Sequence, residues 1–291
     1  MPQHQIIDVP IDRVRGDELS EGTDVLAVEE PLEIRVQLGA HAPGTRRTVS
    51  VTMRTPGGDM EDAELAVGLL VAEGVVRCRT DVLDVRRCGP VSRPVPNAMR
   101  VTLGADADLS RLDRHGVTTS ACGVCGKTSL DALRPTPAWT LGAASLALEP
   151  SLVHALPDAL RGAQATFART GGLHAAALFD ACGRLYLVRE DVGRHNAVDK
   201  VVGAELLAGR LPAHDRVLLV SGRASFELVL KAVMAGIPVL AAVGAPSSLA
   251  VSLADDCGLT LLGFVRDERF NVYAGAHRIR AAAATTLTAL P

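Results

Sequence analysis

Short, mostly apolar segments alternate with segments of helical periodicity throughout the second half of this chain. Residues 184–188, 217–220, 239–243 and 259–265 have the length of strands, and the stretches between them repeat apolar residues at helical spacing. Apolar strands that are separated by helices are typical of a largely parallel sheet with both faces covered. The pattern therefore predicts an α/β domain with a mostly parallel sheet over residues 146–291.

The first half of the chain has a different pattern. Residues 32–36 and 48–53 alternate apolar and polar side chains, which predicts two half-buried antiparallel strands. A helix is predicted through residues 65–70, where apolar residues recur at helical spacing. We therefore expect a small α+β domain over residues 1–115, followed over residues 116–145 by a connecting segment of little periodicity.

The composition indicates a globular protein with a large core, because 48% of the 291 residues are hydrophobic. A net charge of −3 argues against a general affinity for nucleic acid. The N-terminus does not join a basic start to an apolar run, and no apolar stretch reaches the roughly 20 residues of a membrane-spanning helix. We therefore expect a soluble, cytoplasmic protein with reduced cysteines and no nucleic-acid or membrane partner.

Two of the six cysteines, Cys122 and Cys125, form a Cys-x-x-Cys pair in the connecting segment. The glycines beside them predict a mobile loop, and the nearby Lys127 favours the nucleophilic thiolate. A structural zinc site would need a second pair of ligands. A zinc deaminase would need an acid/base glutamate where Ala176 stands. A thioredoxin-like dithiol would lie at a strand-to-helix junction, which this segment does not resemble.

Polar and basic residues follow the predicted strands of the second half at their carboxyl ends. In open α/β sheets this edge carries the ligand crevice, because helix N-termini there present free N–H groups to anions. The residues concerned are Arg194, His195, Lys200, Ser221, Gly222 and Arg223. Arginine forks and a lysine charge could hold the pyrophosphate of a nucleotide-like ligand. No Walker or dinucleotide fingerprint is present, so these residues are equally well interpreted as solvated charges on loops.

Three further features have simpler explanations. Glu227 and Lys231, four residues apart, are interpreted as a pair on a helix surface. His174, at the start of a predicted strand or helix, is interpreted as a hydrogen-bonded structural residue. Arginines are frequent between residues 77 and 114, and we interpret this stretch as a solvated face, although an acidic partner or a phosphorylated ligand would also suit it.

Five motifs are distinctive when they are taken together. They occupy residues 119–126, 170–174, 190–200, 221–223 and 270–273. In this order, and over nearly the whole chain, they resemble the FdhD family of formate dehydrogenase accessory sulfurtransferases. The resemblance implies a C-terminal domain of cytidine-deaminase-like fold without deaminase chemistry, and a homodimer. It also implies the transfer of sulfur from a cysteine desulfurase to the bis-molybdopterin guanine dinucleotide cofactor (Mo-bis-MGD) of formate dehydrogenase.

The resemblance also implies roles for individual residues. Cys122 matches the family's persulfide cysteine, and Cys125 would assist it. The segment that contacts the cofactor matches Phe264, Val265, Arg266, Asp267, Glu268 and Arg269, and GDP would serve as a fragment of that cofactor. The leading hypothesis is therefore a sulfurtransferase that carries sulfur as a cysteine persulfide. The alternative is a non-catalytic chaperone that only binds the cofactor.

Overall fold

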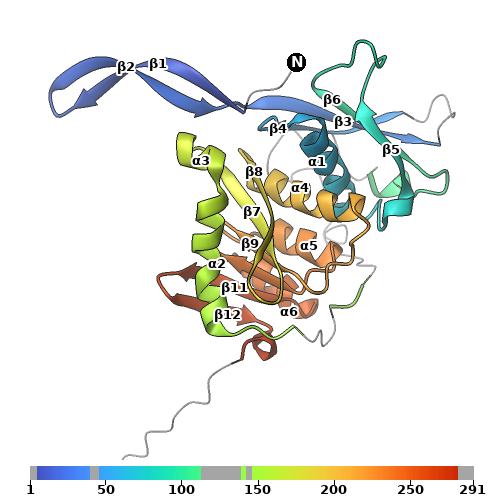
Figure 1. Cartoon of the computed structure of the whole chain (residues 1–291). Coiled ribbons are helices and arrows are strands. Elements are labelled where there is room, and N and C mark those ends of the chain that lie inside the picture. The colour runs from blue at the N-terminus through green and yellow to red at the C-terminus, as the bar shows by residue number, and fades with distance from the viewer. Residues whose placement is uncertain (1–4, 40–45, 113–138, 142–145, 281–291) are drawn as a thin grey trace, which may run out of the picture.

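Three β-sheets and the helices around them make up the computed structural model, which describes residues 5–39, 46–112, 139–141 and 146–280 (Figure 1). The strands are β1 (Ile6–Arg15), β2 (Glu18–Ala27), β3 (Glu30–Leu38), β4 (Arg47–Arg54), β5 (Val82–Arg87), β6 (Ala98–Leu103), β7 (His174–Phe179), β8 (Leu185–Asp191), β9 (Val217–Val220), β10 (Val239–Ala242), β11 (Thr260–Arg266) and β12 (Arg269–Ala274). The α-helices are α1 (Gly58–Ala72), α2 (Pro150–Ala163), α3 (Ala165–Thr170), α4 (Arg194–Leu207), α5 (Phe226–Met234) and α6 (Ser248–Asp256). The 3₁₀ turns include η1 (Arg79–Asp81), η2 (Leu109–Leu112) and η4 (Ala276–Arg278).

The second half of the chain forms a six-stranded sheet in the order β12-β11-β10-β9-β7-β8. Only two pairs of neighbouring strands, β9–β10 and β10–β11, are parallel, and each pair is connected by a helix, α5 or α6. The pairs β7–β8, β7–β9 and β11–β12 are antiparallel. The prediction of an α/β unit is therefore confirmed, but the sheet is mixed rather than mostly parallel. The connections after β7 and β11 are short hairpins. Parallel strands need a longer crossover connection, so these two pairs are antiparallel.

Both faces of this sheet are covered, as the apolar strands predict. Alternate residues of β9 show this, because Leu218 and Val220 join one buried cluster with α4, α5 and α6. Val217 and Leu219 join a second cluster with α2 on the opposite face. Every position of β9 is therefore apolar, because the side chains on each face of the strand lie in a buried cluster.

The first half of the chain forms a four-stranded sheet in the order β4-β3-β6-β5. The two predicted strands are confirmed as β3 and β4, which pair antiparallel. The predicted helix is confirmed as α1, and Gly74 follows its end with a φ of +72°. Strand β6 lies parallel to β3, which the sequence pattern did not indicate.

Helices α1 and α4 cross at two glycines and join the two halves. A side chain at Gly68 would collide with the carbonyl oxygen of Asp199, and one at Gly203 with the carbonyl oxygen of Glu64. One buried cluster runs from Leu32 and Leu70 to residues of the six-stranded sheet. The division into domains at residues 115 and 146 stays a prediction.

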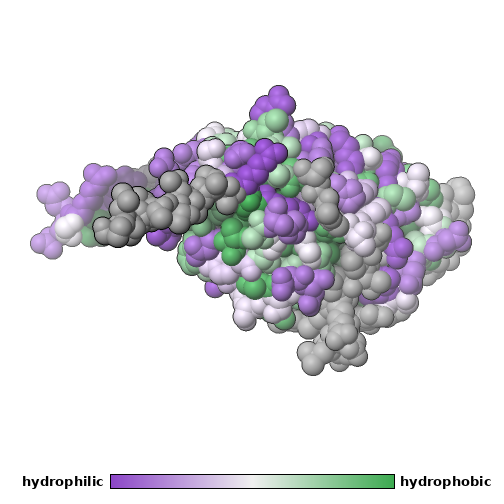
Figure 2. Space-filling view, turned by 90° about the horizontal axis from the view of Figure 1, so that it is seen from below, coloured by the Kyte–Doolittle hydropathy of each residue, from purple (hydrophilic) through white to green (hydrophobic). Residues whose placement is uncertain are grey.

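Strands β1 and β2 form an arm over residues 6–27 that projects from the body (Figure 1). Figure 2, turned by 90°, shows the same arm standing clear of the body with mostly hydrophilic side chains. Its base is attached where the Thr166 hydroxyl lies 3.0 Å from the Gln5 amide oxygen. Ile7, Val14, Leu19 and Leu26 on the arm are each at least 43% exposed. None of the described helices is long and apolar enough to span a membrane.

Candidate ligand-binding edge

The predicted strand-end residues meet at one edge of the six-stranded sheet, formed by the carboxyl ends of β8, β9, β10 and β11. Because β7 runs antiparallel to β8 and β9, its first residue, His174, pairs with Asp191 at the end of β8. Two residues further on, Ala176 pairs with Val220 at the end of β9. We call this the strand-end edge, and Ser221, Gly222 and Arg223 follow directly on it.

Backbone hydrogen bonds fix the connections at the strand-end edge. The Ser221 hydroxyl accepts a hydrogen bond from the Ala175 N–H at 2.9 Å, and the Ser221 N–H donates to the Ala175 carbonyl. The Gly244 N–H after β10 donates to the Gly222 carbonyl, and the Gly244 carbonyl accepts from Phe264 in β11. The three turns are therefore held side by side, and the Arg223 side chain is exposed beside them.

The first turn of α4 brings Arg194 and His195 to the same edge. The N-terminal N–H groups of this 14-residue helix carry the positive end of its dipole, which favours an anion. Arg194 Nε and His195 Nδ1 are buried and have no hydrogen-bond partner among the described residues. Buried polar atoms in native proteins are normally satisfied, so each of these atoms has room for a hydrogen bond to a water molecule or a ligand.

His195 is held by α5. Its Nε2 atom lies 2.8 Å from Glu227 Oε2 and 3.3 Å from the Ser225 hydroxyl, and the residue is only 8% exposed. Burial lowers the pKa of the neighbouring His174, and the charges of Arg194 and His195 lower it further. Burial and the neighbouring positive charges therefore disfavour protonation of His174 at this edge.

Lys200 does not belong to this edge, which corrects its prediction as a phosphate contact. Its ammonium group is completely buried and lies 2.9 Å from Asp191 and 3.1 Å from Glu61. It also donates to the carbonyls of Thr55 and Glu190. Burial opposes the charge, but the two carboxylates outweigh it and the pKa of Lys200 is raised. Lys200 is a structural cation between α1 and β8.

The interpretation of Glu227 and Lys231 as a surface pair is wrong. Both residues are buried, and each has a partner on α4 instead. Lys231 Nζ donates to Asp199 Oδ1 at 2.6 Å, and Glu227 binds His195. Helical spacing alone predicts that the two side chains are neighbours but not that α4 covers them. Glu227 is thus a residue of the edge that the sequence did not predict, and no local motif marks it; Ser225 ends the strand-end stretch that begins at Ser221.

The predicted cofactor segment forms the end of β11 and a hairpin turn. Val265 is fully buried in the second cluster, so its side chain cannot contact a ligand, which corrects that part of the prediction. Phe264 is half-buried with a φ of +55°, a backbone strain that is uncommon for an aromatic residue and often marks functional sites. The Arg266 guanidinium lies 5.8 Å from the Phe264 ring centre. Asp267, Glu268 and Arg269 are exposed on the turn.

Cys122 and Cys125 lie outside the described residues. The described residues that flank their segment are Leu112 and Trp139, and Trp139 Nε1 donates to the Met234 carbonyl at 3.0 Å. Met234 ends α5, which begins at the strand-end edge and runs back to the start of β10. Trp139 therefore lies at the edge opposite the strand-end edge. In the described part of the chain, no group of three His, Cys, Asp or Glu residues is arranged to hold a metal ion.

Known proteins resemble this chain over most of its length. A sequence model of the FdhD/NarQ family matches residues 27–280. A sulfur carrier protein FdhD from Streptomyces avermitilis is 52% identical over 280 residues, covering 94% of this chain and 95% of the relative. One from Nocardia farcinica is 50% identical, covering 91% and 92%. The crystal structure of a proposed formate dehydrogenase accessory protein from Desulfotalea psychrophila matches with a TM-score of 0.70 and 26% identity, covering 95% of this chain and 100% of that one.

Proposed function

The chain belongs to the FdhD/NarQ family, and from this premise we propose that it carries sulfur during the maturation of a formate dehydrogenase. Relatives that match nearly end to end at about half identity are named sulfur carrier proteins. The related solved structure is described as a formate dehydrogenase accessory protein. These names support the general role, and the residues of this chain suggest how it is carried out.

The sulfur donor in this proposal is a cysteine desulfurase, and the carrier is Cys122. The Cys122 thiolate attacks the terminal sulfur of the donor's persulfide, forms Cys122–S–SH and releases the donor's cysteine thiolate. Attack by the Cys125 thiolate on Cys122 Sγ would then release hydrosulfide and leave a disulfide, which is one way in which Cys125 could assist. The sulfur acceptor is Mo-bis-MGD, which is bound as a substrate.

The strand-end edge is the proposed site for this anionic substrate. The observation that supports binding is the pair of unpartnered buried atoms, Arg194 Nε and His195 Nδ1, at the N-terminus of α4. Ser221, Gly222 and the exposed Arg223 lie beside them. On the far side of the edge, Phe264, Arg266 and Arg269 would contact the same ligand.

The carrier role is tested by mass spectrometry after the protein has been incubated with a cysteine desulfurase and cysteine. The wild-type protein should gain the mass of one sulfur, and Cys122→Ala should lose this gain. Cys182→Ala is the matched control, because Cys182 is an exposed free cysteine on the turn between β7 and β8. An unchanged gain in Cys122→Ala would remove Cys122 from the reaction.

The binding site is tested by calorimetry with GDP. Losing one charged hydrogen bond costs on the order of 1.5–3 kcal/mol, so Arg223→Ala should weaken GDP binding roughly ten- to a hundredfold. Arg184→Ala is the control, since Arg184 is 80% exposed and is paired with Asp180 far from the edge. Equal GDP affinities in the two variants would exclude Arg223 from the site.

A cofactor-binding chaperone is the second candidate function. The unpartnered atoms at the edge support it as well as they support a sulfur carrier, because both functions need a cofactor-binding site. Formate dehydrogenase activity in cells that carry Cys122→Ala separates the two candidates. A sulfur carrier loses this activity, whereas a chaperone that only binds the cofactor keeps most of it. The protein is also proposed to act as a homodimer, which light scattering on the purified protein tests directly.

A further inference from the structure

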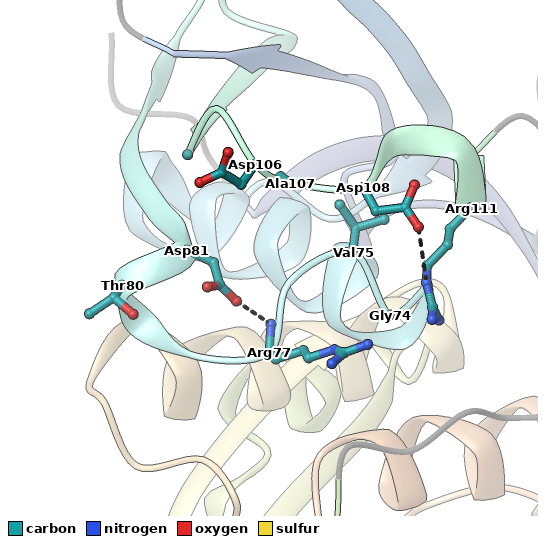
Figure 3. Close-up of a pocket in the computed structure, with 10 residues that line it drawn as sticks. Gly74, Val75, Arg77, Thr80, Asp81, Asp106, Ala107, Asp108 and Arg111 are labelled. Atoms are coloured by element: carbon teal, nitrogen blue, oxygen red, sulfur yellow. Dashed lines mark hydrogen bonds and ion pairs between the residues drawn. The ribbon is translucent and has the colours of Figure 1, made fainter.

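A polar cleft of about 480 Å³ lies in the first half of the chain, apart from the strand-end edge (Figure 3). The end of α1, the segment 75–81 and the segment 104–111 form its walls. Its volume is in the range of small-molecule sites. The basic stretch that the sequence analysis interpreted as a solvated face supplies two of its residues, Arg77 and Arg111.

The two guanidinium groups in this cleft have unused hydrogen-bonding capacity. Arg77 is exposed, and its guanidinium makes no hydrogen bond or ion pair with the described residues, although its charge helps to lower the pKa of Asp81. Arg111 has one weak ion pair, with Asp108 at 3.8 Å. Gly74 provides the space for Arg111, because a Cβ there would lie 2.7 Å from a guanidinium nitrogen. Guanidinium forks that are not already paired suit a carboxylate or a phosphate.

Two of the three carboxylates in the cleft are already occupied. Asp81 accepts hydrogen bonds from the backbone N–H groups of Arg77 at 2.7 Å and Cys78 at 3.0 Å. Burial raises the pKa of Asp81, but these bonds outweigh it and keep the carboxylate ionised. Asp108 accepts from the Ser110 N–H and hydroxyl. Asp106 is exposed and makes no hydrogen bond or ion pair with the described residues.

The charges in the cleft are of opposite sign and compensate each other only in part, through the Arg111–Asp108 ion pair and the effect of the Arg77 charge on the pKa of Asp81. Figure 3 shows the carboxylates of Asp81 and Asp106 on one side of the cleft and Arg111 on the other, with the Arg77 side chain extending from beside Asp81 toward Arg111. A simple anion would meet three carboxylates, and a simple cation would meet two guanidinium groups. A ligand with both charges satisfies both sides.

We propose that this cleft binds a small zwitterion that carries a carboxylate and an ammonium group, which is the chemistry of a free amino acid. Arg77 and Arg111 bind the carboxylate, and Asp106 binds the ammonium group. The inference goes beyond the proposed function, because the cleft shares no residue with the strand-end edge.

Binding to the full-length protein is measured by calorimetry with glycine, 4-aminobutyrate and 6-aminohexanoate, whose charges are progressively further apart. Butyrate and butylamine are the matched probes that each lack one charge of 4-aminobutyrate, as acetate and ethylamine are for glycine and hexanoate and hexylamine are for 6-aminohexanoate. The zwitterion of the best length should bind at least about tenfold more tightly than probes of the same length that lack one charge. If no zwitterion binds more tightly than its singly charged counterparts, the proposal is wrong.

Variants assign the two ends of the ligand. Arg111→Gln and Asp106→Asn should each weaken binding of the best zwitterion about tenfold. Asp106→Asn should at the same time strengthen butyrate binding, because a repelling carboxylate is lost. Arg86→Gln is the control, since Arg86 is 55% exposed on β5 and pairs with Asp84 outside the cleft. Unchanged zwitterion affinity in Asp106→Asn, or an equal loss in Arg86→Gln, would overturn the assignment.

Discussion

His174 shows how the strand-end edge treats an added positive charge. The residue begins β7 and is half-buried next to the first turn of α4. Burial, then Arg194 and His195, lower its pKa, so the imidazole is neutral in the folded protein at pH 7. An anion bound at the edge would offset the neighbouring positive charges and raise this pKa again.

This environment makes the stability of the protein depend on pH. The contribution of His174 is fully present above about pH 6.5, the ordinary histidine value, and is lost as the pH falls through the lower folded pKa. Between these two values the unfolded chain binds the proton and the folded protein does not. Wild-type protein should therefore lose more unfolding free energy between pH 7 and pH 5 than His174→Gln does, as measured by urea denaturation.

A histidine titration by NMR provides the direct control. The His174 signal should report a pKa below the ordinary value, and saturating GDP should move it upward. A His174 pKa at or above the ordinary value in the free protein would contradict both the buried environment and the predicted pH dependence.

At the residue level, the sequence predicted which segments reach the edge but not how their charges are used. Arg194, Ser221 and Arg223 lie where the strand pattern predicts. Lys200 does not face the edge, because it is buried against α1. Val265 does not face it either, because its side chain lies in the buried cluster with α2. Such burial depends on elements that are distant in the sequence. The predicted roles of Cys122 and Cys125 fall outside the described residues and stay predictions.

At the scale of elements, the β11–β12 hairpin is the most strained connection described. Its two central residues, Asp267 and Glu268, have φ values of +52° and +53°, and Arg266 pairs with Arg269 across the turn. Two-residue turns with two positive φ values favour Asn-Gly or Asp-Gly. A glutamate at the second position is therefore unfavourable, because its side chain crowds the backbone.

Glu268→Gly should accordingly stabilise the protein, by up to about 1 kcal/mol in the free energy of unfolding. Glu21→Gly is the matched control, because Glu21 is exposed within β2 and its φ is not in the left-handed region. That variant should lose about 0.5–1 kcal/mol, the usual cost of glycine in a strand. Chemical denaturation of both variants gives the comparison, and destabilisation by Glu268→Gly would contradict the strained turn.

Elements with a clear apolar period were the predictable part of the fold. The parallel strands β9, β10 and β11, the pair β3–β4 and the helices α1 and α5 all follow from the spacing of their own residues. For the antiparallel strands of the larger sheet, the sequence predicted strand positions but not strand directions, because direction depends on the connections between strands. The arm escaped prediction, because its exposed strands lack a buried face to impose a period.

At the scale of the whole molecule, the crossing of α1 and α4 holds the two halves together. The helices approach so closely that Gly68 and Gly203 each face a backbone carbonyl of the other helix. Around them lie ion pairs between the halves, including Arg189 with Glu64 at 2.6 Å. Packing and charge therefore both oppose separation of the halves.

Gly203→Ala should disturb this crossing, because the added methyl group meets the Glu64 carbonyl. We expect a loss of about 1–3 kcal/mol in the free energy of unfolding, measured by urea denaturation. Gly162→Ala in α2 is the control, because nothing lies within 4 Å of the added carbon, and it should be neutral or slightly stabilising. Equal stabilities in the two variants would show that the crossing can relax.

The arm has an electrostatic consequence for the whole molecule. Residues 6–27 hold six carboxylates and two arginines, a net charge of −4, while the entire chain carries −3, so the remaining residues together carry +1. Because the arm extends away from the body, this separation gives the protein a large electric dipole moment (Figure 1). An approaching charged protein is turned by that dipole before any contact forms. For a positively charged partner, which the acidic arm attracts, the rate of encounter should therefore fall as salt shortens the Debye length, even where the final affinity changes little.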